Sequence, residues 1–317
     1  MDTRESASVH TRREILGCGG VAAATLAGCS PTGTEVQEEW TRAVNGRIRQ
    51  SVCFWCFESS EWAWDLDTLA AHAASLGLES VELLAPEQWP TVKKHGLTCA
   101  IAGNGVPAPP FVKGLNNPRY QADVIEATKA TMDACAQEGI PSVIAFTGYK
   151  WTDAEDPQSG EISREEGARN TIGGLKELAA YGEEKGVTVC LEMLNTRDDT
   201  HPMKGHPGYQ GDDIDYCADI IREVGSPRAK LLFDIYHVQI MNGDVIRRIR
   251  SIHDLIGHIH TAGNPGRNEL HLQQEIHYPS VMEALVEVGY QGFVGQEFIP
   301  TRDPLDSLAR AVRLCDV

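Results

Sequence analysis

Basic residues are scarce in this sequence. The chain carries 28 Lys and Arg residues against 45 Asp and Glu residues, for a formal net charge of −17. Proteins that bind nucleic acid through phosphates need a face rich in Lys and Arg, and no such basic stripe is present. The composition therefore argues against a nucleic-acid partner, including cleavage of abasic DNA by a metal-dependent endonuclease.

Two other patterns are missing. No Gly-x-Gly-x-x-Gly follows any strand-like segment and no P-loop occurs, which argues against a doubly wound nucleotide-binding sheet. After the N-terminal region no apolar run approaches the roughly 18 residues that a membrane-spanning helix needs. We expect membrane contact, if any, through a lipid alone.

The 9 cysteines lack the tight spacing of a disulfide framework. Cys53-Phe-Trp-Cys56 is the single CxxC, and it lies in a strand-like run rather than before a helix, which argues against a redox motif. Apart from Cys18 and Cys29 near the N-terminus, we expect the cysteines to act as small buried hydrophobic residues.

The first 28 residues are expected to be a targeting segment rather than part of the fold. Arg12-Arg13 forms a twin-arginine pattern before a short Gly/Ala-rich apolar run, and Leu26-Ala27-Gly28-Cys29 resembles a bacterial lipobox. These features predict export to the periplasmic side of a bacterial cell envelope, with a lipid on Cys29. Residues 29–46 would form a tether and residues 47–317 the folded domain.

The folded domain repeats one unit, a short apolar run followed by an amphipathic helix. Helical periodicity is clear in residues 64–76, 120–137, 164–185 and 213–224, and several of these segments end at a glycine. Eight strands are expected in the segments 50–57, 80–84, 97–102, 142–147, 187–192, 230–234, 256–260 and 292–297. Eight such units joined by short connections predict an α/β fold, a single-domain (β/α)₈ TIM barrel.

Four consecutive strand-like segments carry a polar residue at or near their ends. Glu192, Asp234, His260 and Glu297 take these positions. In a barrel the C-terminal ends of the strands share one mouth, so these side chains are expected to converge. Each residue has an ordinary alternative as a loop cap or surface ion pair, but three carboxylates and one imidazole are a suitable ligand set for a divalent cation.

Two further polar residues follow these strand ends. His237 lies three residues beyond Asp234, where we expect the strand to pass into a loop, and it could donate to a substrate oxygen. Arg267 is held by a Gly/Pro-rich loop after His260 and could bind a substrate carboxylate or hydroxyl pair; its alternative is a surface charge. His258 is expected to be a packing residue.

These segments also carry a resemblance. The stretches 191–197, 233–243, 257–260, 265–267 and 295–300 are similar to the hydroxypyruvate isomerase branch of the xylose isomerase-like TIM barrels, a group that includes ketose 3-epimerases. The resemblance is dense from about Val187 to Leu308. It departs at His260, where the most similar isomerases tend to have Gln, and at the long loop 198–208, which contains His201 and His206.

The resemblance implies an isomerase with one divalent metal ion. Mn²⁺ is expected first, with Mg²⁺, Co²⁺ or Zn²⁺ as alternatives. Glu192, Asp234, His260 and Glu297 would bind the ion, Glu192 and Glu297 would also move the proton, and His237 and Arg267 would hold substrate oxygens.

The reaction expected is isomerisation through an enediolate, of hydroxypyruvate to tartronate semialdehyde or of a similar keto acid or sugar. Two alternatives stay open: a metal-dependent ketose 3-epimerase or sugar isomerase, and a lipid-anchored sugar-binding protein without catalytic activity. A homo-oligomer is also compatible with the sequence.

Overall fold

Seven parallel strands form the centre of the folded domain. In the computed structural model, which describes residues 42–58 and 61–317, the hydrogen-bonded order is β2-β1-β7-β6-β5-β4-β3. The strands are β1 (Arg49–Cys53), β2 (Ser80–Glu82), β3 (Ser142–Ala145), β4 (Thr188–Glu192), β5 (Ala229–Asp234), β6 (Ile256–Thr261) and β7 (Phe293–Gln296). Almost every residue in them is buried, as expected for strands covered by helices on one face and packed side chains on the other.

An irregular segment joins the two outer strands of this sheet. Thr98 makes a parallel bridge with Ser80 of β2, and Ala102 makes one with Val143 of β3. The segment therefore takes the place of the eighth strand that was predicted for residues 97–102. The result is an α/β TIM-barrel-like fold in one domain.

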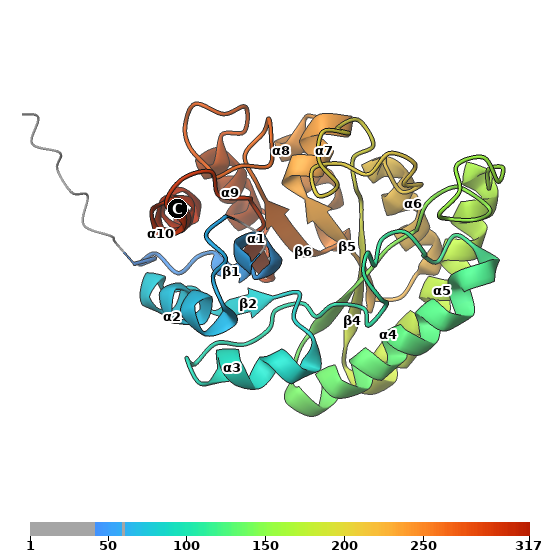
Figure 1. Ribbon diagram of the computed structural model, residues 1–317, viewed down its shortest axis with the longest axis horizontal. Coiled ribbons are helices and arrows are strands. Elements are labelled where there is room, and N and C mark those ends of the chain that lie inside the picture. The colour runs from blue at the N-terminus through green and yellow to red at the C-terminus, as the bar shows by residue number, and fades with distance from the viewer. Residues whose placement is uncertain (1–41, 59–60) are drawn as a thin grey trace, which may run out of the picture. The chain divides into compact units, whose positions relative to one another are not determined.

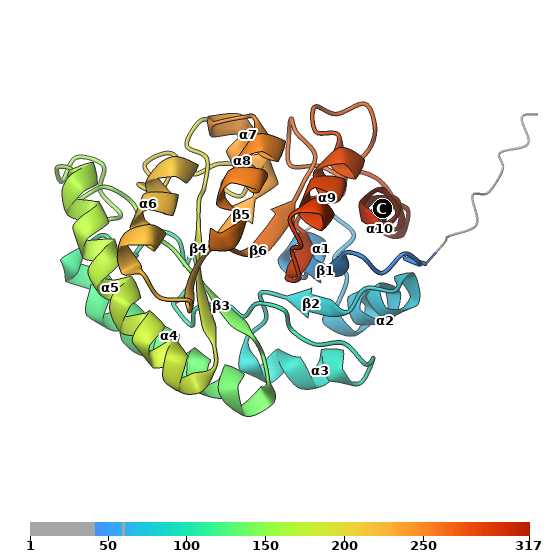
Figure 2. The same cartoon turned by 180° about the vertical axis from the view of Figure 1, so that it is seen from behind.

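Helices form the outer ring (Figures 1 and 2). The longer ones are α2 (Leu66–Leu76), α4 (Pro118–Glu138), α5 (Arg164–Lys185), α6 (Ile214–Val224), α8 (Val245–Ile252), α9 (Tyr278–Glu287) and α10 (Pro304–Cys315), and the short ones are α1 (Trp55–Glu58), η1 (Pro86–Gln88), α3 (Trp89–Lys93), α7 (Ile235–Met241) and η2 (His253–Leu255). The colour gradient runs once around the ring and brings α10 next to α2 (Figure 1).

Local sequence signals explain where the longer helices begin and end. The side chain of Ser163 accepts a hydrogen bond from the backbone N–H of Glu166 and so caps α5. Gly186 ends the same helix with a φ of 76°, a conformation that glycine adopts without steric cost. Because both signals are local, residues 164–185 were predicted with the correct bounds.

Two segments differ from the prediction. The first strand ends at Cys53, and Trp55–Glu58 forms α1 instead of extending the strand to residue 57. His237 lies in α7, not in a loop, because helix α7 starts directly after β5. The Asp234 carboxylate accepts the backbone N–H groups of Tyr236 (2.8 Å) and His237 (3.2 Å), so it caps this helix.

The described N-terminal segment is attached near the beginning of β1. The backbone N–H of Ala43 donates to Leu76 at the end of α2, and that of Val44 donates to the Asp316 carboxylate. This places residues 43–47 at the N-terminal end of the strands, opposite the strand ends that carry the predicted site. The predicted export signal and Cys29 lie outside the described residues, and within those residues no helix is long and apolar enough to cross a membrane.

Candidate active site

The four predicted strand-end residues converge. Glu192, Asp234, His260 and Glu297 each offer one ligand atom, and these atoms all lie within 4.8 Å of one another. The parallel register explains the convergence, because Asp234 pairs with His260 across β5 and β6, and His260 pairs with Gly295 across β6 and β7. All four side chains are buried.

This cluster fits a divalent cation. His260 Nδ1 lies 2.9 Å from Glu297 Oε2 and 3.5 Å from Glu192 Oε1, yet neither Nδ1 nor Glu192 Oε1 has a hydrogen bond. Buried polar atoms without partners are rare, and these two face each other inside the cluster. Three carboxylates and one imidazole also match the oxygen-rich donor sets of hard divalent ions.

Arg267 lies against the same carboxylates. Its Nη2 atom is 3.3 Å from Asp234 Oδ2 and also contacts Glu297 Oε2, and its guanidinium carbon is 5.2 Å from the ring centre of Trp55. If all three carboxylates are ionised and His260 is neutral, as a metal ligand must be, one arginine leaves two negative charges uncompensated. A divalent ion would balance them, because buried charges are stable only when they are paired.

The carboxylates differ in their pKa values. Burial raises the pKa of Glu192, and it raises the pKa of Asp234 to about 7 although Arg267 opposes the shift. Burial acts in the same direction on Glu297, but the charges of Arg267 and His260 outweigh it and hold the pKa of Glu297 well below its ordinary value. Glu297 also accepts a hydrogen bond of 2.9 Å from the indole N–H of Trp55, a contact that the sequence did not predict.

His237 presents one free nitrogen to the site. Its Nδ1 atom accepts the backbone N–H of Asn195 at 3.1 Å, so the neutral ring carries its proton on Nε2. Nε2 is buried without a hydrogen bond, 3.5 Å from Asp234 Oδ2. Burial and the charge of Arg267 lower the pKa of His237, which keeps the ring neutral and able to donate.

A cavity of about 320 Å³ opens beside the cluster and is mostly apolar. Glu192, Arg267 and Glu297 lie at one side, and the remaining wall consists of Trp55, Leu83, Gly103, Asn104, Ala108, Pro110, Phe111, Ile144, Phe146, Leu194, Met203 and His206. Its size suits a small molecule.

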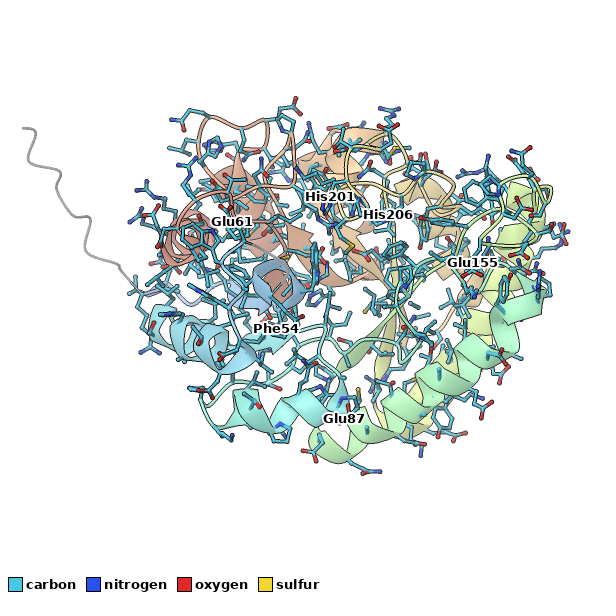
Figure 3. All side chains as sticks on the ribbon, viewed as in Figure 1. Phe54, Glu61, Glu87, Glu155, His201 and His206 are labelled. Atoms are coloured by element: carbon cyan, nitrogen blue, oxygen red, sulfur yellow. The ribbon has the colours of Figure 1, made fainter. Side chains whose placement is uncertain are left out.

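The long β4–α6 loop contributes to this cavity through His206. Figure 3 labels His201 and His206 in this loop; His201 is exposed, whereas His206 is buried with its ring 4.3 Å from that of Phe111. Burial and the charge of Arg267 lower the pKa of His206 to about 3. Because its Nδ1 atom is buried without a partner, His206 is a neutral polar group available to a bound molecule.

A second layer of residues supports His260. Glu82, at the end of β2, lies within hydrogen-bonding distance of His260 and of His258, which was expected only to pack. Sequence reasoning missed Glu82, although it too is a carboxylate at the end of a strand, because no neighbouring motif drew attention to β2.

Comparisons with known proteins agree with the TIM-barrel-like fold. The family described as "Xylose isomerase-like TIM barrel" matches residues 70–315. A protein named putative hydroxypyruvate isomerase from Homo sapiens is 33% identical over 135 residues, which are 43% of this chain and 47% of the relative. The 2-oxo-tetronate isomerase of Cupriavidus necator is 40% identical over 116 residues, which are 37% of this chain and 42% of the relative. The chain thus spans about half the length of these relatives.

The fold is also found among solved structures. The structure of 3-keto-D-glucoside 4-epimerase from E. coli superposes with a TM-score of 0.66 at 20% identity, covering 84% of this chain and 100% of the other. At that identity the likeness concerns the fold alone. The family match extends over most of the chain, and the chain therefore belongs to the xylose isomerase-like TIM-barrel family.

Proposed function

We propose that this protein is an isomerase or epimerase that moves a proton within a small hydroxy-carbonyl compound. The observation that carries the proposal is the pair Glu192 and Glu297, which lie at the cavity wall within one cluster of ligand atoms. One carboxylate would remove a proton from carbon. The other would return it, either to the adjacent carbon or to the opposite face of the same carbon.

The other residues would prepare the pair and the substrate. Glu192, Asp234, His260 and Glu297 would hold a divalent ion, whose chemistry when bound is Lewis-acid polarisation of the substrate's carbonyl and hydroxyl oxygens. His237 would donate its Nε2 proton to a substrate oxygen. Arg267 and Trp55 would fix the orientation of Glu297, one at each carboxylate oxygen.

A keto acid is the first candidate substrate. The relatives named hydroxypyruvate isomerase and 2-oxo-tetronate isomerase support it, because their names specify a keto acid as the compound isomerised. The reaction would then be isomerisation of hydroxypyruvate to tartronate semialdehyde, or of a similar acid.

An uncharged ketose or keto-sugar is the second candidate, and the cavity favours it. Among the described residues that line the cavity, Arg267 is the one cation, and Asp234 and Glu297 already pair with it. Apart from the proposed divalent ion, a substrate carboxylate would find no further cationic side chain among these residues, whereas sugar hydroxyls could bind Asn104 and His206. The reaction would then be epimerisation or aldose–ketose isomerisation.

Deuterium incorporation separates these possibilities. The pure protein, with Mn²⁺ added, is incubated in deuterated water with hydroxypyruvate, other 2-keto acids and a panel of ketoses, and carbon-bound deuterium is measured by mass spectrometry. Deuterium in the acids supports the first candidate and deuterium in the ketoses the second. Absence of deuterium from every compound would overturn the proposal and favour a sugar-binding protein.

We also propose that the protein is exported and anchored by a lipid at Cys29, on the periplasmic side of a bacterial cell envelope. The twin-arginine pattern and the lipobox-like segment support this. The described chain enters the barrel at the N-terminal end of β1, opposite the strand ends that carry the candidate site.

A further inference from the structure

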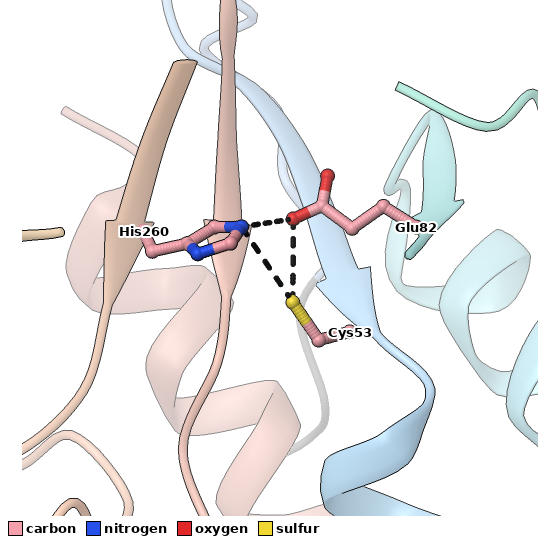
Figure 4. A group of neighbouring side chains, drawn as sticks. All are labelled: Cys53, Glu82 and His260. Carbon is pink, nitrogen blue, oxygen red and sulfur yellow. Dashed lines mark hydrogen bonds and ion pairs between the residues drawn. The ribbon is translucent and has the colours of Figure 1, made fainter. Parts of the chain in front are cut away.

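Glu82 lies beneath the candidate metal site. Its carboxylate is fully buried, and its Oε1 atom is 3.1 Å from Nε2 of His260, 3.2 Å from Nε2 of His258 and 3.4 Å from the thiol sulfur of Cys53. Figure 4 shows Glu82, His260 and Cys53 arranged around this oxygen.

The contact determines which nitrogen of His260 can serve as a ligand. When the neutral ring donates its Nε2 proton to Glu82, Nδ1 is left as a lone-pair acceptor. Nδ1 is the nitrogen that faces Glu192 and Glu297 and that has no hydrogen bond. Carboxylates commonly orient metal-binding histidines in this way and raise their basicity.

We infer that Glu82 is a positioning residue that fixes the tautomer and orientation of His260 and thereby strengthens divalent cation binding by the four-residue cluster.

The barrel interior is shaped to let Glu82 reach His260. Glu82 belongs to β2 and His260 to β6, and β1 and β7 lie between them in the sheet. Gly295 of β7 permits the contact between Glu82 and His260 because it has no side chain. A Cβ atom at this position would lie 1.7 Å from Glu82 Oε1 and 3.0 Å from His260 Cδ2. Any other residue at position 295 would displace the carboxylate or the ring.

His258 supplies a second partner for the same carboxylate. It lies two residues from His260 on β6, so both imidazoles point to the same side of the strand. Its Nε2 atom lies within hydrogen-bonding distance, 3.2 Å, of Glu82 Oε1, which provides a second partner for a carboxylate that has no contact with solvent. Cys53, Glu82 and His260 could also be considered as metal ligands. We assign hydrogen bonding to Glu82 instead of metal binding, because the imidazoles of His258 and His260 both already lie within hydrogen-bonding distance of its carboxylate.

Cation affinity measured without substrate tests the assignment, so the result does not depend on the proposed reaction. The metal-free full-length protein is titrated with Mn²⁺ by calorimetry, and Glu82→Gln is compared with Glu79→Gln, an exposed residue just before β2. Glu82→Gln is expected to weaken Mn²⁺ binding by about 10- to 100-fold, as loss of such outer partners does in other metal sites, with one ion still bound. Glu79→Gln should bind as the wild type does.

Gly295→Ala provides an independent perturbation, since it crowds the Glu82 carboxylate without removing a polar group. It should weaken Mn²⁺ binding as well, and the double variant Gly295→Ala, Glu82→Gln should bind Mn²⁺ about as weakly as Glu82→Gln alone, because both changes disturb the same contact with His260. Losses of affinity that simply add in the double variant would indicate two unrelated structural effects.

Two results would overturn the inference. One is a Glu82→Gln variant that binds Mn²⁺ as tightly as the wild type does. If Glu82→Gln does not fold, Glu82→Asp replaces it, and wild-type Mn²⁺ affinity in that variant would overturn the inference equally. The other is binding of two ions by the wild type with loss of one in Cys53→Ala, which would identify Cys53, Glu82 and His260 as a second cation site.

Discussion

Arg267 pairs with two buried carboxylates at once, with Nη2 at 3.3 Å from Asp234 Oδ2 and in contact with Glu297 Oε2. The side chains of all three residues are at most 5% exposed. An arginine that was predicted to hold substrate oxygens thus also holds the acid/base cluster together.

Loss of Arg267 should destabilise the metal-free protein strongly. Arg267→Met leaves two buried carboxylates without their cation, a change that typically costs about 3 to 5 kcal/mol in unfolding free energy. Urea denaturation measures this, and added Mn²⁺ should restore part of the loss by supplying positive charge.

Arg250→Met is the matched control, because Arg250 pairs with Glu287 at the surface and such pairs contribute at most about 1 kcal/mol. Equal losses in the two variants would show that the buried cluster does not need Arg267 for charge balance.

Removing either proton-transfer carboxylate should slow exchange strongly while the fold is kept. Glu192→Gln and Glu297→Gln are expected to slow deuterium incorporation by about 10²- to 10⁴-fold, the usual contribution of a positioned acid or base. Glu87→Gln, a change at an exposed glutamate of η1, should leave the rate unchanged. A rate in Glu297→Gln close to that of the wild type would remove this residue from the mechanism.

Stability should fall as the pH drops below 6.5, partly because of His206. Burial and Arg267 lower its folded-state pKa to about 3 from an ordinary 6.5, so between these values the unfolded chain binds a proton that the folded protein does not. Stability therefore decreases with decreasing pH, and His206 should account for about 2 kcal/mol of the loss between pH 7 and pH 5.

Urea denaturation of His206→Asn at the two pH values should show a correspondingly smaller loss, whereas His253→Asn, a change at an exposed histidine, should keep the wild-type dependence. A His206→Asn variant that is as acid-sensitive as the wild type would refute the explanation.

The N-terminal prediction is tested by fractionation of cells. Cys29→Ser should move the protein from the membrane fraction to the soluble periplasmic fraction and prevent labelling with radioactive palmitate, because the lipid would attach to that thiol. Replacing Arg12 and Arg13 by Lys should block export. Wild-type protein in the cytoplasm without label would contradict the predicted lipid anchor.

The polar residues at the strand ends of the C-terminal half could be predicted from the sequence. A buried parallel strand that ends at a site has a simple sequence pattern, an apolar run followed by a polar residue. That pattern identified Glu192, Asp234, His260 and Glu297 from the sequence. It failed for the segment 97–102, which closes the barrel through bridges at Thr98 and Ala102 rather than through a regular strand.

The contacts around the site could not be predicted in the same way. Glu82 crosses two strands to reach His260, and Trp55 reaches Glu297 from the helix after β1, so both contacts depend on closure of the barrel. Helix α7 was missed because Asp234 has two functions: it ends β5 in the cluster and also caps the next helix.

Elemental analysis of protein purified without added metal tests the four-residue site most directly. Wild type is compared with Glu297→Gln and His260→Ala, and circular dichroism confirms that each variant is folded. We expect about one equivalent of a divalent ion in the wild type, Mn²⁺ in the first place, and markedly less in both variants. No metal in the wild type, even after incubation with Mn²⁺, or metal content unaffected by both substitutions, would contradict the site and the function proposed from it.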